Sequence, residues 1–153
     1  MQPAERLAAL GVTLPRAPKA IGAYVPSLVL GRQLLTSGHL PLQADGSLIR
    51  GKVGAELDLA AGKAAARQAG LAVLATVIAA VGSVDRVARV VKVLGLVNST
   101  PDFLSHPAVV NGASELFTEV WGPDAGVGVR SSVGVGSLPE GVPVEIEVVF
   151  ELG

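Results

Sequence analysis

The chain has 153 residues, of which 50% are hydrophobic, 16% charged and 3% aromatic, with a formal net charge of -1. This length is typical of a single domain with a substantial core, which must here consist mainly of Ala, Val and Leu. The charge gives no electrostatic footprint for nucleic acid or anionic lipid. The absence of cysteine excludes disulfides and thiolate chemistry and is compatible with a reducing cytoplasm. So apolar a composition also predicts that another subunit covers part of the surface.

Neither the N-terminus nor the longest apolar run indicates a membrane or secreted protein. Glu5 and Arg6 precede a very short apolar run, which is not typical of a secretory signal. The apolar stretch 69–81 is shorter than the roughly 20 residues that span a bilayer. We therefore expect a soluble cytoplasmic protein without a membrane partner.

The first third of the chain predicts a short helix followed by a β-hairpin. Residues 5–10 can form a helical turn. Residues 24–30 and 33–37 have the pattern of short strands, and Gly31-Arg32 between them favours a hairpin turn. Residues 40–54 contain Pro, Gly and Asp-Gly and are expected to form a loop.

Residues 56–81 predict a long helix that ends at Gly82. Glu56 and Asp58 are expected in its first turn, where acidic side chains suit the helix dipole. Its apolar residues recur at steps of three and four and predict one buried stripe. The stripe consists of Leu57, Ala61, Ala64, Leu71, Leu74, Ile78 and Val81.

The valine-rich segment 87–97 predicts a strand that is largely buried on both faces. A second helix is expected to begin at Ser105 or His106 and to run to Trp121, where Gly122-Pro123 ends it.

Residues 126–152 form two alternating runs around a turn signal at 138–141. Their period of two is typical of half-buried strands, so the pattern predicts a C-terminal hairpin. The complete order, ββαβαββ, indicates an α+β fold with two helices packed on one face of a mixed sheet. Arg130 stands in the first run among serines and glycines, which leaves space around its guanidinium for a ligand. The alternative is an edge-strand arginine paired with a glutamate.

These C-terminal residues also carry a family signature. The motif R-S-x-V-x-x-G-x-L at 130–138, followed by V-E-I at 144–146, resembles that of the RidA (YjgF) reactive-intermediate deaminase family, also labelled endoribonuclease L-PSP. Residues 21–24, 35–41 and 110–111 are similar to further motifs of that family. The resemblance covers roughly residue 18 to the C-terminus, so residues 1–17 of the single domain 1–153 are expected to be an extension.

The resemblance implies a chorismate-mutase-like fold and homotrimers with sites in the clefts between subunits. It implies hydrolysis of reactive 2-imino and enamine acids to 2-keto acids and ammonia, without a metal or organic cofactor. Arg130 would bind the carboxylate of a small metabolite, since arginine offers a carboxylate two parallel hydrogen bonds. Glu145 would position or activate water. The substrate-binding residues implied are Tyr24, Ser37, Gly38, Asn111 and Ser132.

Each of these residues has a structural alternative. Glu145 is one of three glutamates on one strand face and could simply be solvated, while Tyr24 could pack in the core. Ser37-Gly38 could be a mere strand end, and Asn111 could serve only its helix. His39 and His106 lack metal-ligand spacing and are expected to be structural or solvent-facing.

The predicted hairpin adds a geometric expectation. If 138–142 is a tight turn, residues whose numbers sum to about 280 face each other, which places Glu145 near Val135 and Arg130 near Phe150. The two charged residues would then be roughly 17 Å apart and could share a small ligand only across a subunit boundary.

Three features depart from the family pattern and predict a divergent subgroup. Many relatives have cysteine where this chain has Ser132, residues 99–108 form a longer loop, and the N-terminal extension precedes the matched part. One alternative function is a non-catalytic carboxylate-binding or regulatory module of the same fold. Another is an endoribonuclease or translation inhibitor, against which the neutral charge and scarce aromatic residues argue.

Overall fold

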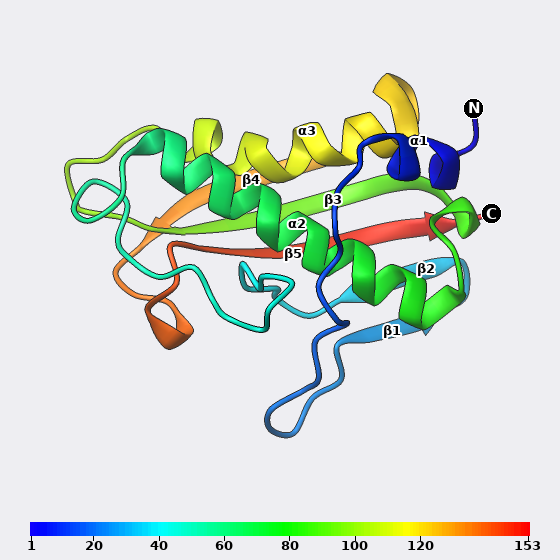
Figure 1. Ribbon diagram of the computed structural model, residues 1–153, viewed down its shortest axis with the longest axis horizontal. Helices are drawn as coiled ribbons and strands as arrows, with labels where there is room; N and C mark the ends of the chain where they lie inside the picture. Colours follow the sequence, from blue (N-terminus) through cyan, green and yellow to red (C-terminus); the bar gives the residue numbers. More distant parts are fainter.

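The computed structural model describes residues 1–153 and confirms the α+β class. Three α-helices lie with a five-stranded sheet in the order β1-β2-β5-β3-β4 (Figure 1). Two short 3-10 helices, η1 (Val84–Arg86) and η2 (Pro139–Gly141), lie in connections. The helices are α1 (Pro3–Ala9), α2 (Leu59–Val81) and α3 (His106–Ala125); the strands are β1 (Ser27–Leu30), β2 (Gln33–Thr36), β3 (Val87–Asn98), β4 (Val129–Val135) and β5 (Val144–Leu152).

The sheet is mixed, as predicted, because β3 and β4 are parallel while all other neighbours are antiparallel. The N-terminal hairpin of β1 and β2 is confirmed. The C-terminal hairpin is wrong, since β3 lies between β4 and β5. The alternating pattern identifies a half-buried strand but not its partner. The expected pairing of residues whose numbers sum to about 280 is therefore wrong as well. Glu145 is opposite Leu96, and Arg130 is beside Val93.

Helix α2 begins three residues later than predicted, because the backbone of Gly54 and Leu57 forms a turn there. Asp58 is its N-cap and accepts a hydrogen bond from the Ala61 amide at 2.8 Å. Glu56 lies before the helix and accepts from the Lys52 amide instead. Gly82 ends the helix with φ of 89°, as predicted from the sequence.

The predicted stripe is wrong in the first half of α2, where Ala64 is exposed and Gly62 is buried. The real contact surface consists of small residues that allow α3 to approach closely. Gly70 lies against Leu116 and Ala113, and a Cβ on Gly112 would overlap the Lys63 carbonyl oxygen. Glycine and alanine therefore determine the packing of α2 on α3 more than the larger apolar residues do.

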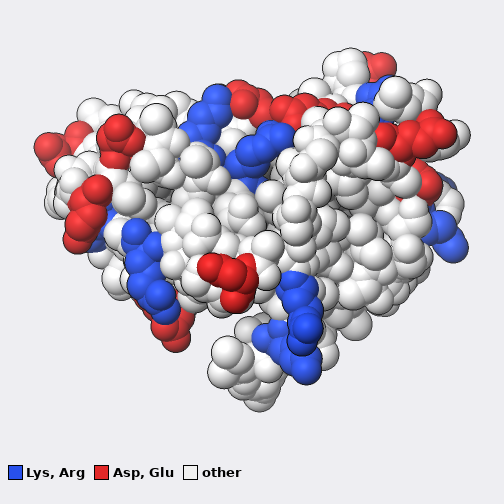
Figure 2. Space-filling model, viewed as in Figure 1, with Lys and Arg blue, Asp and Glu red and all other residues white.

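Helix α2 is long and apolar enough to cross a membrane by length and composition alone. Its apolar segment is longer than 69–81, the stretch on which the sequence-based expectation rests. It is mostly buried inside the domain, where it packs on α3 and β5, so it is the core helix of a soluble domain. On the outside, Lys63 and Arg67 pair with Glu115 and Glu119 of α3 at 3.0 and 2.7 Å. Figure 2 shows this band of paired charges along the seam between the two helices.

Helix α3 has Ser105 as its N-cap, and its regular part ends after Trp121, as predicted. Gly122 has φ of 85° and ψ of 172°, which breaks the helical path before Pro123. The Trp121 indole donates to the Val84 carbonyl at 3.0 Å and fixes this end of the helix to η1. The three rings of Phe117, Trp121 and Phe150 pack on one another in the core.

Strand β3 is not buried on both faces, contrary to prediction. Val90, Val93 and Val97 are buried beneath the helices, whereas Leu94 and Leu96 on the other face are only partly covered. The helices cover a single face of the sheet, and no layer of this chain covers the opposite face, called here the open face (Figure 1). Large apolar side chains are exposed on it and along both edge strands: Leu28, Leu30, Val129 and Val133.

The N-terminal segment packs on the helical layer. Helix α1 contacts α3, and the Ala4 amide donates to Asp85 Oδ1 of η1 at 2.8 Å. The chain then crosses α2 and forms a loop that extends away from the body before β1 begins (Figure 1). Whether residues 1–17 are an extension of the domain stays a prediction.

Candidate functional site

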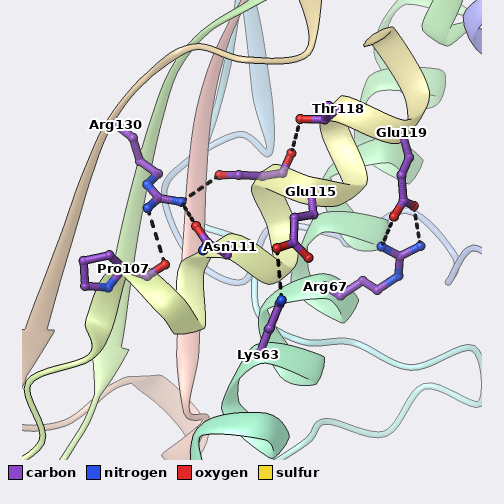
Figure 3. Close-up of polar contacts among 9 residues, drawn as sticks. Lys63, Arg67, Pro107, Asn111, Glu115, Thr118, Glu119 and Arg130 are labelled. Carbon is purple, nitrogen blue, oxygen red and sulfur yellow. Dashed lines mark hydrogen bonds and ion pairs between the residues drawn. The ribbon is translucent and has the colours of Figure 1, made fainter. Parts of the chain in front are cut away.

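Arg130 lies on edge strand β4, and its side chain points toward α3. Its NH1 donates to Asn111 Oδ1 at 2.7 Å and to Ser114 Oγ at 3.2 Å, and NH2 donates to the Pro107 carbonyl at 3.4 Å (Figure 3). All three acceptors are neutral, and none of the four ion pairs includes Arg130. The alternative of an arginine paired with glutamate is therefore not observed. The guanidinium is oriented but retains an unpaired positive charge.

The guanidinium borders a pocket of about 220 Å³ between α3 and the start of β4. An arginine side chain has five N–H donors. Nε and one N–H of NH2 have no acceptor within the chain. A planar carboxylate or similar anion could accept from these two remaining donors.

Ser132 follows Arg130 on the same side of β4. Its Oγ is buried and has no hydrogen-bond partner. A buried hydroxyl without a partner costs about 1–3 kcal/mol, so such an atom calls for a ligand, a water or a partner group. Arg130 and Ser132 thus place an unpaired charge and an unpaired buried hydroxyl on the same side of β4, although Ser132 does not line the pocket beside Arg130.

A second group of predicted residues gathers where β2 ends. Glu145 of β5 lies directly over Gly38, where any Cβ would overlap its carboxylate. The carboxylate makes no hydrogen bond to the chain. Burial, and secondly the charge of Glu147, raises the pKa of Glu145 above its ordinary value. A half-buried carboxylate with a raised pKa has the character of a general base rather than of a solvated surface group.

Tyr24 and Ser37 lie next to Gly38 at the base of the extended loop. Tyr24 is 51% exposed, so the alternative of a core tyrosine is wrong. Its hydroxyl accepts from the Ile21 amide at 3.3 Å, and Ser37 Oγ donates to the Val25 carbonyl at 2.5 Å. Tyr24 and Ser37 also line a neighbouring hollow of about 300 Å³.

The structure thus separates the predicted residues into two half-sites. Arg130, Asn111 and Ser132 form the first, between β4 and α3. Tyr24, Ser37, Gly38 and Glu145 form the second, and Glu145 points to the open face because its neighbours on β5 are buried beneath the helices. Arg130 pairs with Val93 on one side of β3, and Glu145 pairs with Leu96 on the other side. Their Cα atoms are therefore about 14 Å apart, and their side chains point to opposite faces of the sheet. One small ligand cannot contact both side chains within one chain.

Both histidines have structural contacts. His39 is buried; its Nδ1 lies 2.7 Å from the Ser37 carbonyl and its Nε2 lies 2.7 Å from Thr76 Oγ1. Burial lowers the pKa of His39, so the neutral ring donates from Nδ1 and accepts from Thr76. His106 packs edge-on against Phe103, and its Nε2 lies 3.1 Å from Ser99 Oγ. No group of three or more His, Asp or Glu side chains is placed to bind a metal ion.

Sequence reasoning missed two groups that hold Arg130: the Ser114 hydroxyl and the Pro107 carbonyl. The available signal was the spacing on α3, since residues three and four apart share a helix face. Asn111 and Ser114 are three apart and both face Arg130 (Figure 3).

Residues 4–139 match the model of the family described as YjgF/chorismate mutase-like, putative endoribonuclease, and the chain belongs to this family. The resemblance drawn from the sequence motifs is therefore confirmed. Membership supports a small-molecule deaminase or a related role.

Relatives match nearly the whole chain. Protein TCP17 of Trypanosoma cruzi is 42% identical over 149 residues, which are 97% of this chain and 93% of that protein. The crystal structure of a putative endoribonuclease from Shewanella oneidensis has 32% identity and a TM-score of 0.94, covering 99% and 100% of the two chains. Escherichia coli TdcF with bound serine has 29% identity and a TM-score of 0.65, covering 90% and 94%. The gap between the two TM-scores is in keeping with a divergent subgroup.

Proposed function

We propose that this protein is a RidA-like deaminase that hydrolyses reactive 2-imino and enamine acids to 2-keto acids and ammonia. The observation that carries the proposal is the unpaired guanidinium of Arg130, held by neutral acceptors beside a pocket and next to the orphaned Ser132 hydroxyl. Such a group suits the carboxylate that every 2-imino acid has. The serine bound to TdcF is a small carboxylate of the same type.

We further propose that each active site is assembled between two subunits of a cytoplasmic homotrimer. The two half-sites cannot meet on one ligand within a chain, but Arg130 of one subunit could face Glu145 of the next. The unpaired edges β1 and β4 and the apolar open face favour association, because exposed apolar surface of this extent is costly in water. Rotational symmetry would then form identical clefts.

In the proposed reaction, Arg130 binds the substrate carboxylate, and Asn111 and Ser114 fix the plane of the guanidinium. Glu145 accepts a proton from a water molecule as the water oxygen forms a bond to C2 and the C=N double bond becomes a single bond. The nitrogen takes up one proton as the double bond opens and a second proton from the protonated Glu145, the C–N bond breaks and ammonia leaves. The carbinol hydroxyl loses its proton as the keto group forms, so that one water is consumed for each ammonia released.

The test is keto-acid release from an imino acid generated in situ by an amino-acid oxidase. Arg130→Ala should lose at least about a hundredfold in rate, because nothing else in its pocket is cationic. Arg86→Ala, which removes an exposed arginine without a side-chain partner, is the matched control and should retain full activity. If wild-type protein does not accelerate release, the deaminase proposal fails; tight carboxylate binding without turnover would select the binding module instead.

A further inference from the structure

A second cavity lies beyond Arg130, between the loop that leads into α3 and the end of β4. Its volume is about 320 Å³, larger than the pocket beside Arg130. It is lined by Ser99, Phe103, Leu104, His106, Gly134 and Gly136, among others. Gly136 belongs to the C-terminal motif, but no residue of the two half-sites described above lines this cavity.

This cavity shares no lining residue with the pocket beside Arg130, but the first residues of α3 connect the two. Arg130 NH2 is bonded to the Pro107 carbonyl, and the next residue toward the N-terminus, His106, forms the cavity wall. Along β4, the residues after Arg130 on the helix-facing side are small. A Cβ on Gly134 would overlap the His106 ring, so the ring lies directly on the strand. A ligand anchored at Arg130 would have to extend past the His106 ring to enter the cavity.

The lining selects an apolar group. None of its nine residues is Asp, Glu, Lys or Arg. Its polar side chains are Ser99, Thr100 and His106, and Ser99 Oγ lies 3.1 Å from His106 Nε2. Phe103 contributes a ring to the lining, and the side chain of Leu104 is 81% exposed.

We propose that this cavity is the side-chain pocket of the enzyme and that its substrates are 2-imino acids with bulky apolar or aromatic side chains. This inference rests on the proposed function. The methyl side chain of the alanine imine would leave most of the cavity unfilled and make few contacts with its walls. A phenyl or isobutyl side chain would make more van der Waals contacts there. Because a single methylene in a hydrophobic pocket changes kcat/KM by about 10-fold or more, the wild-type protein should favour the imine of phenylalanine or leucine over that of alanine by at least about 10-fold.

Gly136→Leu tests the pocket without disturbing the strand. A Cβ at Gly136 meets no atom within 4 Å, so the new side chain can enter the cavity. The matched control is Gly153→Leu, whose Cβ makes only ordinary contacts near Ala88 and Arg86. Rates are measured for imines generated in situ from alanine, leucine and phenylalanine, and sedimentation gives the oligomeric state of each variant.

We expect Gly136→Leu to lower kcat/KM for the bulky imines by at least about 10-fold, while the rate for the alanine imine changes less than about twofold. A wild-type protein that hydrolyses the alanine imine as well as or better than the others overturns the side-chain pocket but leaves the deaminase function intact. The side-chain pocket is also overturned if Gly136→Leu lowers kcat/KM equally for all three imines, or if the loss of activity accompanies a changed oligomeric state. No acceleration of any imine overturns both proposals.

Discussion

The carboxylate of Glu145 can rest on the backbone at Gly38 only because that residue has no Cβ. Gly38→Ala should therefore push the carboxylate aside while leaving the fold intact. Because misplacement by about 1 Å can cost about a hundredfold, we expect kcat/KM for imine hydrolysis to fall by about 10- to 100-fold. Gly153→Ala is the control, since its Cβ makes only ordinary contacts near Ala88 and Arg86, far from the proposed site. Unchanged activity of Gly38→Ala would show that the position of Glu145 is unimportant.

The raised pKa of Glu145 gives the reaction a defined pH dependence. A general base must be ionised, so activity should fall as the pH drops through the pKa of Glu145, which is raised above the ordinary carboxyl value. Glu147→Gln removes a negative charge that contributes to the shift, which lowers the pKa of Glu145 and moves the acid limb of the kcat/KM profile to lower pH. Glu151→Gln, farther along β5, should leave the limb in place. An unmoved limb in Glu147→Gln contradicts the assignment of Glu145 as the base.

At the level of single residues, the sequence predicts the charged site residues better than the neutral groups that contact them. Arg130 stands out because its strand neighbours are small, and this needs no tertiary knowledge. Ser114, Pro107 and the unpaired hydroxyl of Ser132 depend on how α3 is rotated over β4. That rotation follows from close glycine contacts between α2 and α3, which no periodic pattern reveals.

At the scale of elements, His39 connects the end of β2 to α2 through Thr76. Its folded-state pKa is lowered, whereas the unfolded chain has the ordinary value near 6.5. Below that value the unfolded state binds a proton that the folded state does not, so stability should fall as the pH drops below about 6.5.

Urea denaturation between pH 7.5 and 5.5 measures this effect. His39→Gln should be less stable at pH 7.5, because the Thr76 hydroxyl loses a well-placed acceptor, but its stability should depend less on pH than that of the wild type. An equally steep slope in His39→Gln would assign the acid sensitivity to other groups.

Elements and their types are predictable here, whereas strand partners are not. The helix ends at Gly82 and Gly122 follow from local conformational preference, and the N-terminal hairpin follows from its two-residue turn. The position of β3 between β4 and β5 is a long-range property. Nothing in the turn at 139–141 distinguishes a hairpin from a connection that passes across an intervening strand.

At the scale of the whole molecule, the proposed shared clefts predict that two inactive variants rescue each other. Co-expressed Arg130→Ala and Glu145→Gln chains should regain activity, because about a quarter of the clefts in randomly mixed cyclic oligomers combine an intact Arg130 with an intact Glu145. Either variant mixed with the double variant has no complete cleft and should stay inactive. If the two single variants show no recovery although mixed oligomers form, each active site lies within one chain.

The neutral anchoring of Arg130 also affects how the protein should be handled. With no carboxylate of its own nearby, the guanidinium is available to any small anion in the buffer. Phosphate, citrate or sulfate should compete with substrate and raise the apparent KM without changing kcat. Assays in such buffers would underestimate kcat/KM, and a citrate or sulfate ion carried through purification could be mistaken for the natural ligand.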